Sequence, residues 1–282
     1  MARLGVQTLG VTRRRRRAGG PAGPAGLFAS GEQGAWYDPS DLRTLWQDTA
    51  GTVPVTAAGQ LVARIDDKSG NNNHVIQPTE AARPTYQTDG VYHWLEFDGI
   101  NDGMVTREIV PPLFPLQSID FTTTDKVEMF AGLLKTSETV TGVVVEFSAS
   151  WTSNAGSFVA TVNSSGGTLD YTTAARGSVV SGAQVAGTAD DQPDRVVFST
   201  LHDISGDISS LRINGVEINE STADKGTGNF GLHELNLGAR GNAESLFFSG
   251  NLYGLIIRGA ASTAVQTSNT EAYFAAKSGV TL

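Results

Sequence analysis

The sequence predicts an all-β fold for residues 31–282, and two observations carry this prediction. Short runs of β-branched and aromatic residues, broken at close intervals by Gly, Ser, Thr and Asn, recur along that part of the chain, which is typical of many short strands. Helical periodicity is scarce by comparison. A body of about 250 residues buries roughly 70–75% of its unfolded surface, so we expect one domain of two packed antiparallel sheets that folds without metals or disulfides.

The expected strands are the segments in which apolar residues alternate with polar ones. In the segment WLEFDG, Leu95 and Phe97 point to one side of the strand, and the residues between them point to the other. Residues 142–150 and 157–167 are strand candidates that can pair as a hairpin. The remaining strand-forming segments are residues 127–135, 194–203, 209–219, 235–240 and 249–259.

The dipeptide Asn214-Gly215 is a strong local turn signal. It stands between two alternating runs in SSLRINGVEIN. A two-residue type I′ turn needs a positive φ at both central residues, and Asn-Gly meets this need well. We therefore expect a tight hairpin at this position.

Two short helices are expected. The C-terminal tail holds an alanine-rich run with Ser268 or Asn269 as the N-cap and Gly279 at the end, which predicts a helix near residues 270–277. A second candidate helix lies in residues 38–48, where DPSDLRTLWQD offers a capping residue, a proline near the first turn and apolar residues at helical spacing.

Residues 1–30 form a separate, basic segment. They contain six arginines and no acidic residue, whereas residues 31–282 contain 14 basic and 29 acidic residues. The Gly-Pro-Ala composition of residues 20–26 suits an extended, solvated segment that cannot fold alone. We expect an anchoring arm that orders against a partner subunit. The arginines that would pair with carboxylates of that subunit are Arg13, Arg14, Arg15, Arg16 and Arg17.

Export and membrane insertion are not expected. The residues after Arg17 are Ala, Gly and Pro, whereas a secretory signal needs an apolar stretch of roughly 7–15 residues there. The longest apolar stretches fall short of the roughly 18 residues that span a bilayer. The sequence has no cysteine, so it predicts neither disulfides nor thiolate metal sites.

The two ends of the expected domain carry a resemblance to a known family. TLWQDTAGTVPVTAAGQLVARIDDKSGNNNHVIQ, ARPTY and WLEFDGINDGM resemble the opening of LamG-like, concanavalin A-like modules of phage, prophage or gene-transfer-agent virion proteins. SLRINGVEIN, LNLGAR, FFSGNLYGLIIR and EAYFAAKSGVTL are similar to the later strands and terminal helix of that family. The resemblance covers residues 35–282, with a divergent centre between about residues 105 and 190.

This resemblance implies a two-sheet antiparallel jelly roll with a short C-terminal helix. It also implies a lectin-like virion structural protein, such as a decoration, head-spike or tail-fibre subunit, that binds host surface polysaccharide. Other virion subunits would hold it through residues 1–30. A homo-oligomer is expected, with a trimer as one candidate.

Two alternatives remain open beside this interpretation. The first is a glycan-active hydrolase of the same fold, which in that fold supplies its acids as Glu-x-Asp-x-x-Glu. Glu96 and Asp98 match the first half, but the next acid is Asp102, and the resemblance implies that Asp98 bonds turn amides. We therefore expect no catalysis. The second is nucleic-acid binding by the arginines, which is less favoured because the folded part is acidic.

Metals and cofactors have little support. The four histidines are scattered, with no two at the spacing of zinc ligands. Residues 66–74, DDKSGNNNH, are rich in oxygen ligands and are the one calcium candidate, although they lack the glycine and glutamate of an EF-hand loop. The alternative is a solvated turn with Asn and Gly in left-handed conformations.

Trp151 is the leading candidate for glycan contact. It stands in the polar run SASWTSNAGS after an expected strand, where its ring could stack on the CH surface of a sugar. The alternative is that the ring packs beneath its own loop. The further candidates are Asn154, Tyr171, Arg240 and Asn242, which follow or stand in polar loops.

Overall fold

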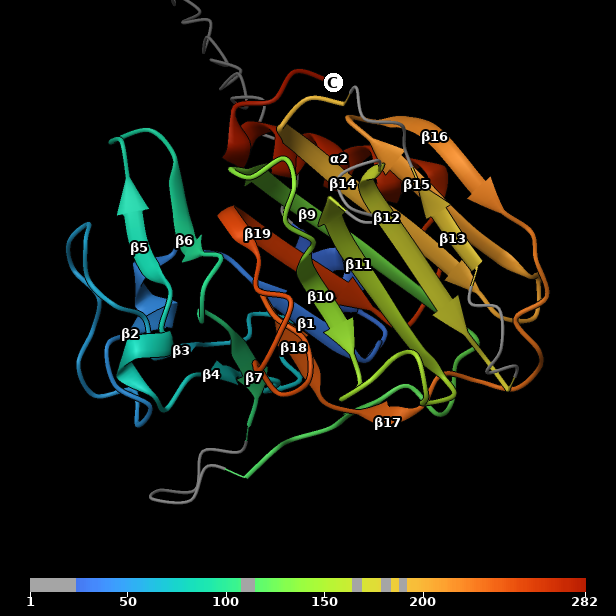
Figure 1. The fold of residues 1–282 in the computed structure, drawn as a ribbon, viewed down its shortest axis with the longest axis horizontal. Coiled ribbons are helices and arrows are strands. Elements are labelled where there is room, and N and C mark those ends of the chain that lie inside the picture. The colour runs from blue at the N-terminus through green and yellow to red at the C-terminus, as the bar shows by residue number, and fades with distance from the viewer. Residues whose placement is uncertain (1–23, 108–114, 164–168, 179–183, 188–191) are drawn as a thin grey trace, which may run out of the picture.

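The computed structural model describes residues 24–107, 115–163, 169–178, 184–187 and 192–282. The predicted anchoring arginines, Arg13–Arg17, lie outside the described residues. The described chain forms two large antiparallel sheets that pack face to face, with one α-helix at the C-terminus (Figure 1). The predicted all-β sandwich of jelly-roll type is confirmed.

The first sheet has the strand order β16-β15-β14-β9-β19-β6-β5, with β1 paired to β19. All of its pairings are antiparallel. Its strands are β1 (Gly34–Tyr37), β5 (Thr85–Thr88), β6 (His93–Asp98), β9 (Lys126–Lys135), β14 (Arg195–Asp203), β15 (Ile208–Ile213), β16 (Val216–Ser221) and β19 (Ser249–Arg258).

The second sheet has the order β13-β12-β11-β10-β18-β7-β4-β3-β2, again antiparallel throughout. Its strands are β2 (Leu45–Trp46), β3 (Arg64–Ile65), β4 (Val75–Ile76), β7 (Met104–Thr106), β10 (Gly142–Phe147), β11 (Ser157–Asn163), β12 (Leu169–Arg176), β13 (Gln184–Gly187) and β18 (Leu235–Leu237). A small third sheet pairs β8 (Ile119–Asp120) with β17 (Leu232–His233).

Both predicted hairpins are confirmed. Strands β10 and β11 pair directly, and β15 and β16 are joined by the Asn214-Gly215 turn. The φ angles of these two residues are 52° and 80°, as a type I′ turn requires.

The C-terminal helix is longer than predicted, and its start was placed wrongly. Helix α2 spans Ala264–Ser278, and its N-cap is Thr263 rather than Ser268 or Asn269. The Thr263 hydroxyl accepts the amide of Gln266 while the Gln266 side chain accepts the Thr263 amide, which is a complete capping box. Gly279 ends the helix in a left-handed conformation, as expected.

The second predicted helix is wrong. Residues 38–48 contain only the single-turn 3-10 helix η2 (Leu42–Thr44), after which Leu45 and Trp46 enter strand β2. Their pairing with β3 replaces the helical hydrogen bonds, so tertiary contacts override the local pattern. Two other 3-10 turns are η1 (Pro24–Phe28) and η3 (Glu80–Ala82).

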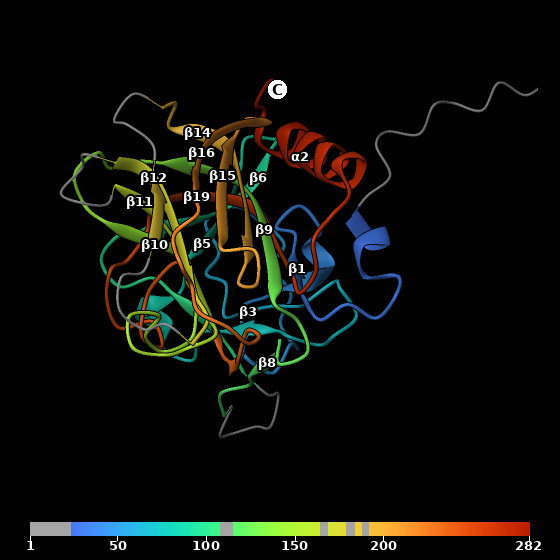
Figure 2. The ribbon, with the colours of Figure 1, turned by 90° about the vertical axis from the view of Figure 1, so that its right-hand side faces the viewer.

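The main core lies between the two sheets and is built from the inward-facing residues of both, with Phe97, Phe147, Phe158 and Phe198 among its large rings. A second apolar cluster joins the outer face of the first sheet to helix α2 and η1 (Figure 2). Leu27 and Phe28 belong to it, so the folded part begins before residue 31 and the arm boundary expected at residue 30 is too late.

Glycines allow the helix to approach the first sheet closely. A Cβ on Gly254 of β19 would lie 2.9 Å from the Phe274 ring and 3.2 Å from the Tyr37 carbonyl oxygen. A Cβ on Gly132 of β9 would lie 3.3 Å from the Ser278 Cβ. Along the described chain, α2 and the 3-10 turns are too short or too polar to span a membrane.

Candidate functional site

The outer faces of the two sheets differ. Helix α2 and η1 cover the first sheet, whereas β10–β12 of the second sheet lie on the other side of the molecule from α2 (Figure 2). Along this second face the outward-pointing side chains Val143, Val159 and Ala174 form a small apolar cluster separate from the core. A groove of about 310 Å³ lies over it.

The groove has a floor of strand residues and walls of loop residues. The floor is made by Val159 and Thr161 of β11 and by Thr172 and Ala174 of β12, which alternate with inward-facing core residues. The remaining lining residues are Thr141, Trp151, Thr152, Leu169, Arg240 and Leu246. Among the described residues, no Asp or Glu lines this groove.

Trp151 lines the groove and is also half-buried. Its indole packs against Val143, Val159 and Ala174, so part of the ring does pack beneath its loop. The rest of the side chain lines the groove. Both interpretations of this residue therefore describe part of its surface, and its glycan contact stays a prediction.

Glu146 fixes both walls of the groove from below. It is fully buried, and its Oε1 accepts the Trp151 amide at 2.7 Å and lies 3.4 Å from Arg240 Nε. Burial raises the pKa of this carboxyl, while the Trp151 amide and the Arg240 charge act in the opposite direction. The sequence analysis missed Glu146, although an acid inside the apolar run GVVVEF was a usable signal.

Arg240 links two loops that line the groove. Its Nη2 donates to the hydroxyls of Thr152 at 2.8 Å and Ser150 at 3.2 Å. The loop after β18 is thereby tied to the Trp151 loop. The two candidates Trp151 and Arg240, far apart in the sequence, are brought into one groove.

Arg176 is a second residue that the sequence analysis missed. It ends β12 on the same face as Thr172 and Ala174. Its guanidinium lies over the Trp151 ring, 5.2 Å from the centroid, and Nη1 donates to the Thr152 carbonyl at 2.6 Å. The residue is only 3% exposed, and burial lowers the pKa of its guanidinium.

Tyr171 is not on the surface, so its predicted place in a glycan site is wrong. It points inward from β12 and is fully buried, with its ring 5.5 Å from that of Phe198. Its hydroxyl donates to the Pro193 carbonyl at 2.7 Å. The alternation of β12 places this ring in the core.

Asn154 and Asn242 lie in the loops of the groove but do not line it. The Asn154 amide donates to the Ser150 carbonyl and its own carbonyl accepts the Ser157 hydroxyl, which closes the Trp151 loop. Asn242 has a φ of 63°, and its amide donates to Asn236 Oδ1 at 2.8 Å. Both residues stabilise the conformation of their loops, and their contact with glycan stays a prediction.

Asp98, the last residue of β6, stabilises the turn that follows the strand. Asp98 Oδ1 accepts the amides of Ile100 at 2.8 Å, Asn101 at 3.1 Å and Asp102 at 3.3 Å, which confirms the predicted role of Asp98. Burial raises the pKa of Asp102 to about 6, and the charges of Asp98 and Glu96 add to this effect.

The calcium candidate at residues 66–74 is a hydrogen-bonded turn. The Asp67 carboxylate accepts three backbone amides and one hydroxyl of the protein. Gly70 and Asn72 adopt left-handed conformations with φ of 96° and 60°, as the alternative interpretation expected. No three His, Cys, Asp or Glu side chains gather at metal-binding distance within the described ranges.

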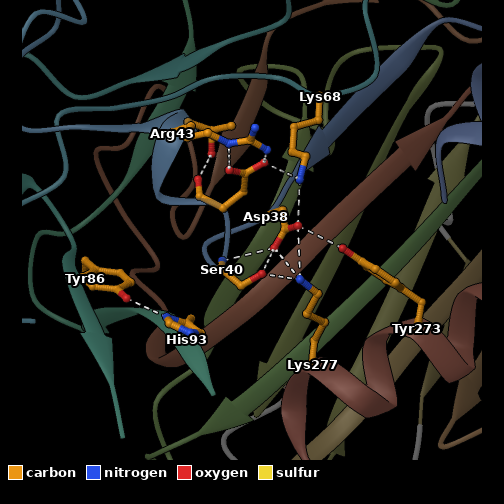
Figure 3. Close-up of polar contacts among 10 residues, drawn as sticks. Asp38, Ser40, Arg43, Lys68, Tyr86, His93, Tyr273 and Lys277 are labelled. Carbon is orange, nitrogen blue, oxygen red and sulfur yellow. Dashed lines mark hydrogen bonds and ion pairs between the residues drawn. The ribbon is translucent and has the colours of Figure 1, made fainter. Parts of the chain in front are cut away.

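A cluster of ionised side chains surrounds Asp38 (Figure 3). Its carboxylate accepts Lys68 Nζ at 2.9 Å, Tyr273 OH at 3.0 Å, Lys277 Nζ at 3.1 Å and Ser40 Oγ at 2.7 Å. Burial alone would raise the pKa of Asp38, but the two ammonium groups and the hydrogen bonds lower it to about 2. Ser40 Oγ donates a hydrogen bond to Asp38 and accepts one from Lys277 Nζ, so the polar groups of this cluster are paired with one another.

Comparisons with known proteins agree with the fold. No family model matches the sequence, and no curated protein matches it either. An arabinofuranosidase complexed with arabinofuranosyl-alpha-1,2-xylobiose is similar with a TM-score of 0.56 and 12% identity, over 91% of this chain and 65% of that chain. At such identity the likeness shows the fold alone.

Two further structures are similar at the same level. Botulinum neurotoxin type C, whose cell entry depends on interaction with two ganglioside molecules, has a TM-score of 0.52 and 8% identity over 84% of this chain and 51% of that chain. A receptor binding domain has a TM-score of 0.52 and 9% identity over 74% of this chain and 48% of that chain. The chain therefore spans about half to two thirds of the three structures.

Proposed function

We propose that this protein is a virion structural subunit whose sandwich domain binds host surface polysaccharide without cleaving it. The observation that carries the proposal is the groove on the open sheet face, where Trp151 and Arg240 stand over a floor of threonine hydroxyls and small apolar side chains. An indole can stack on the CH face of a sugar ring, and hydroxyl and guanidinium groups can pair with its hydroxyls.

Two of the similar structures concern sugar ligands, an arabinofuranosyl-xylobiose complex in one and gangliosides in the other. Their likeness supports a fold that accommodates carbohydrate, and the chemistry of this groove supports carbohydrate for this chain. The place in a virion rests on the LamG-like segments of the sequence and on the basic N-terminal segment, whose composition suits an anchor.

Binding without turnover is part of the proposal. A retaining glycosidase needs two carboxylates about 5–5.5 Å apart beside the bound sugar. None of the described residues that line the groove carries a carboxylate, and the Asp98 carboxylate that the hydrolase alternative would use is engaged by three turn amides. Weak single sites are sufficient when many copies act together.

The test is glycan binding by the wild-type chain and two tryptophan variants. Trp151→Ala should lower affinity for a bound polysaccharide about tenfold, or about 1.4 kcal/mol, because the variant loses the aromatic face on which a sugar ring would stack. Trp94→Ala is the matched control, since Trp94 is also half-buried but lies on β6 of the other sheet. Equal binding by all three proteins would remove the groove from the site, and release of reducing ends would restore the hydrolase.

A further inference from the structure

We propose that the groove beside Trp151 takes an anionic saccharide, whose carboxylate or sulfate group pairs with Arg240 and Arg176. This inference deepens the proposed function and rests on it. It names the chemical class of the ligand, which the shape of the groove alone does not.

The first argument is the buried guanidinium of Arg176. A buried charge is normally paired with an opposite charge, because taking an ion out of water costs several kcal/mol. Arg176 is 3% exposed, yet no carboxylate of the described residues lies within ion-pair distance of it. Within the same residues its Nε has no hydrogen-bond partner. Within the described part of the chain, this charge therefore has no carboxylate counter-ion.

The second argument is the charge balance around the groove. Glu146 is the one carboxylate in contact with Arg240, and it also accepts the Trp151 amide. Residues 31–282 hold 29 acidic residues against 14 basic ones, but Arg240 is the one charged side chain among the described residues that line the groove. A cationic groove on an acidic body favours an anionic ligand.

The third argument is the position of Thr152. Its carbonyl accepts Arg176 Nη1 at 2.6 Å, and its hydroxyl accepts Arg240 Nη2 at 2.8 Å. One exposed loop residue thus holds both guanidinium groups beside the Trp151 ring. An acidic group that arrives at this loop can replace the weak, neutral acceptors of Thr152 with charge-assisted, bidentate hydrogen bonds. The sugar ring would then lie over the groove floor.

The experiment compares ligands that share one backbone: dextran, carboxymethyl dextran and dextran sulfate. It uses the full chain with Arg13–Arg17 replaced by glutamine, because five consecutive arginines would bind any polyanion. We expect carboxymethyl dextran or dextran sulfate to bind at least about tenfold more tightly than dextran, since a hydrogen bond to a charged group contributes roughly 1.5–3 kcal/mol. The tighter of the two charged polymers identifies the acidic group.

Arg176→Met and Arg240→Met should each remove most of that preference while leaving weak dextran binding. Arg43→Met is the control, because Arg43 is exposed and pairs with Asp41 far from the groove. Thermal unfolding adds a readout that separates ligand binding from structure: Arg176→Met should match or exceed the wild-type Tm, since it removes an uncompensated buried charge.

Four outcomes are decisive. Equal affinity for neutral and charged dextran would overturn the anionic ligand while leaving the glycan-binding proposal standing. A preference that persists in both methionine variants would place the anion elsewhere. A clear fall in the Tm of Arg176→Met would assign this residue to folding, and failure to bind any of a broad set of polysaccharides would defeat the proposed function itself.

Discussion

Asp38, directly after β1, and Lys277, in the last turn of helix α2, form an ion pair with 3.1 Å between Oδ1 and Nζ, although 239 residues separate them in the sequence. Lys68 and Tyr273 bind the same carboxylate. One acid therefore joins the first strand, the 66–74 turn and the C-terminal helix, and the helix covers its sheet face through this contact as well as through apolar packing.

Asp38→Asn should lower the free energy of unfolding by about 2 kcal/mol. Removing one partner from a fully buried pair costs roughly 3–5 kcal/mol, and the loss is smaller here because the side chains of Lys68 and Lys277 are 21% and 25% exposed. Urea denaturation at pH 7 measures the change. Asp224→Asn, at an exposed turn, should shift the urea midpoint little. An equal shift in both variants would show that the Asp38 cluster contributes no more to stability than an exposed acid does.

His202 makes stability fall in mild acid. It is fully buried between the hydroxyls of Thr173 and Ser209, and burial, with a contribution from Lys225, lowers its pKa to about 3. Between about pH 6.5 and pH 3 the unfolded state therefore binds this proton and the folded state does not. Stability should decline by up to about 1.4 kcal/mol per pH unit as the pH falls through that window.

His202→Gln isolates this contribution, because all other titrating groups stay the same. The difference in unfolding free energy between wild type and variant, measured from pH 7.5 to pH 4.5, should shift in favour of the variant as the pH falls. Parallel curves would show that His202 does not set the acid response. His233→Gln, at a less buried histidine that contacts the Ala155 carbonyl, serves as the control.

Gly254→Ala should loosen helix α2 from its sheet. The added Cβ would meet the Phe274 ring at 2.9 Å, and overpacking of this kind costs about 1–3 kcal/mol. We expect a lower Tm and a partial loss of the helical circular dichroism signal. Gly26→Ala, where an added Cβ meets nothing within 4 Å, should leave both unchanged; an unaltered Tm in Gly254→Ala would show that the contact can relax.

Under the proposed virion role, deletion of residues 1–22 should leave a folded domain that no longer joins the particle. The cut spares η1, because Leu27 and Phe28 pack against the helix. Co-sedimentation of the truncated protein with particles measures the effect, and replacement of Arg13–Arg17 by glutamine separates the arginines from the rest of the segment. Normal incorporation of both proteins would show that the anchor lies elsewhere.

The expected strands, which correspond to β6, β9–β11, β14–β16, β18 and β19, were predictable because their signals are local, whereas β1, β5, β7 and β12, among others, were not expected. Alternation and the Asn214-Gly215 turn depend on neighbouring residues only, and both were confirmed. The start of α2 also has a local signal, because Thr263 and Gln266 match the capping-box pattern, but the sequence analysis did not use it. The short helix expected near Leu45 failed because a strand 20 residues further on completes its pairing, and no local window contains that partner.

The site was less predictable, for a physical reason. Trp151 and Arg240 stand in polar loops that the sequence marks. Tyr171 was misplaced because the phase of a strand decides between core and surface, and a shift by one residue inverts the answer. Glu146 and Arg176 belong to the site because each forms a hydrogen bond with the Trp151 loop. A local sequence pattern does not predict such tertiary contacts.

The unequal coverage of the two sheets gives the domain a front and a back. The described chain begins at Pro24, in the turn that packs on helix α2. The floor of the groove is made by residues of β11 and β12, and these strands lie on the other side of the molecule (Figure 2). A support that held the chain at η1 would therefore face the helix side and leave the groove pointing away. Copies fixed to one support in this manner would share a single orientation, so the spacing of the copies would set how many grooves one long ligand can engage at once.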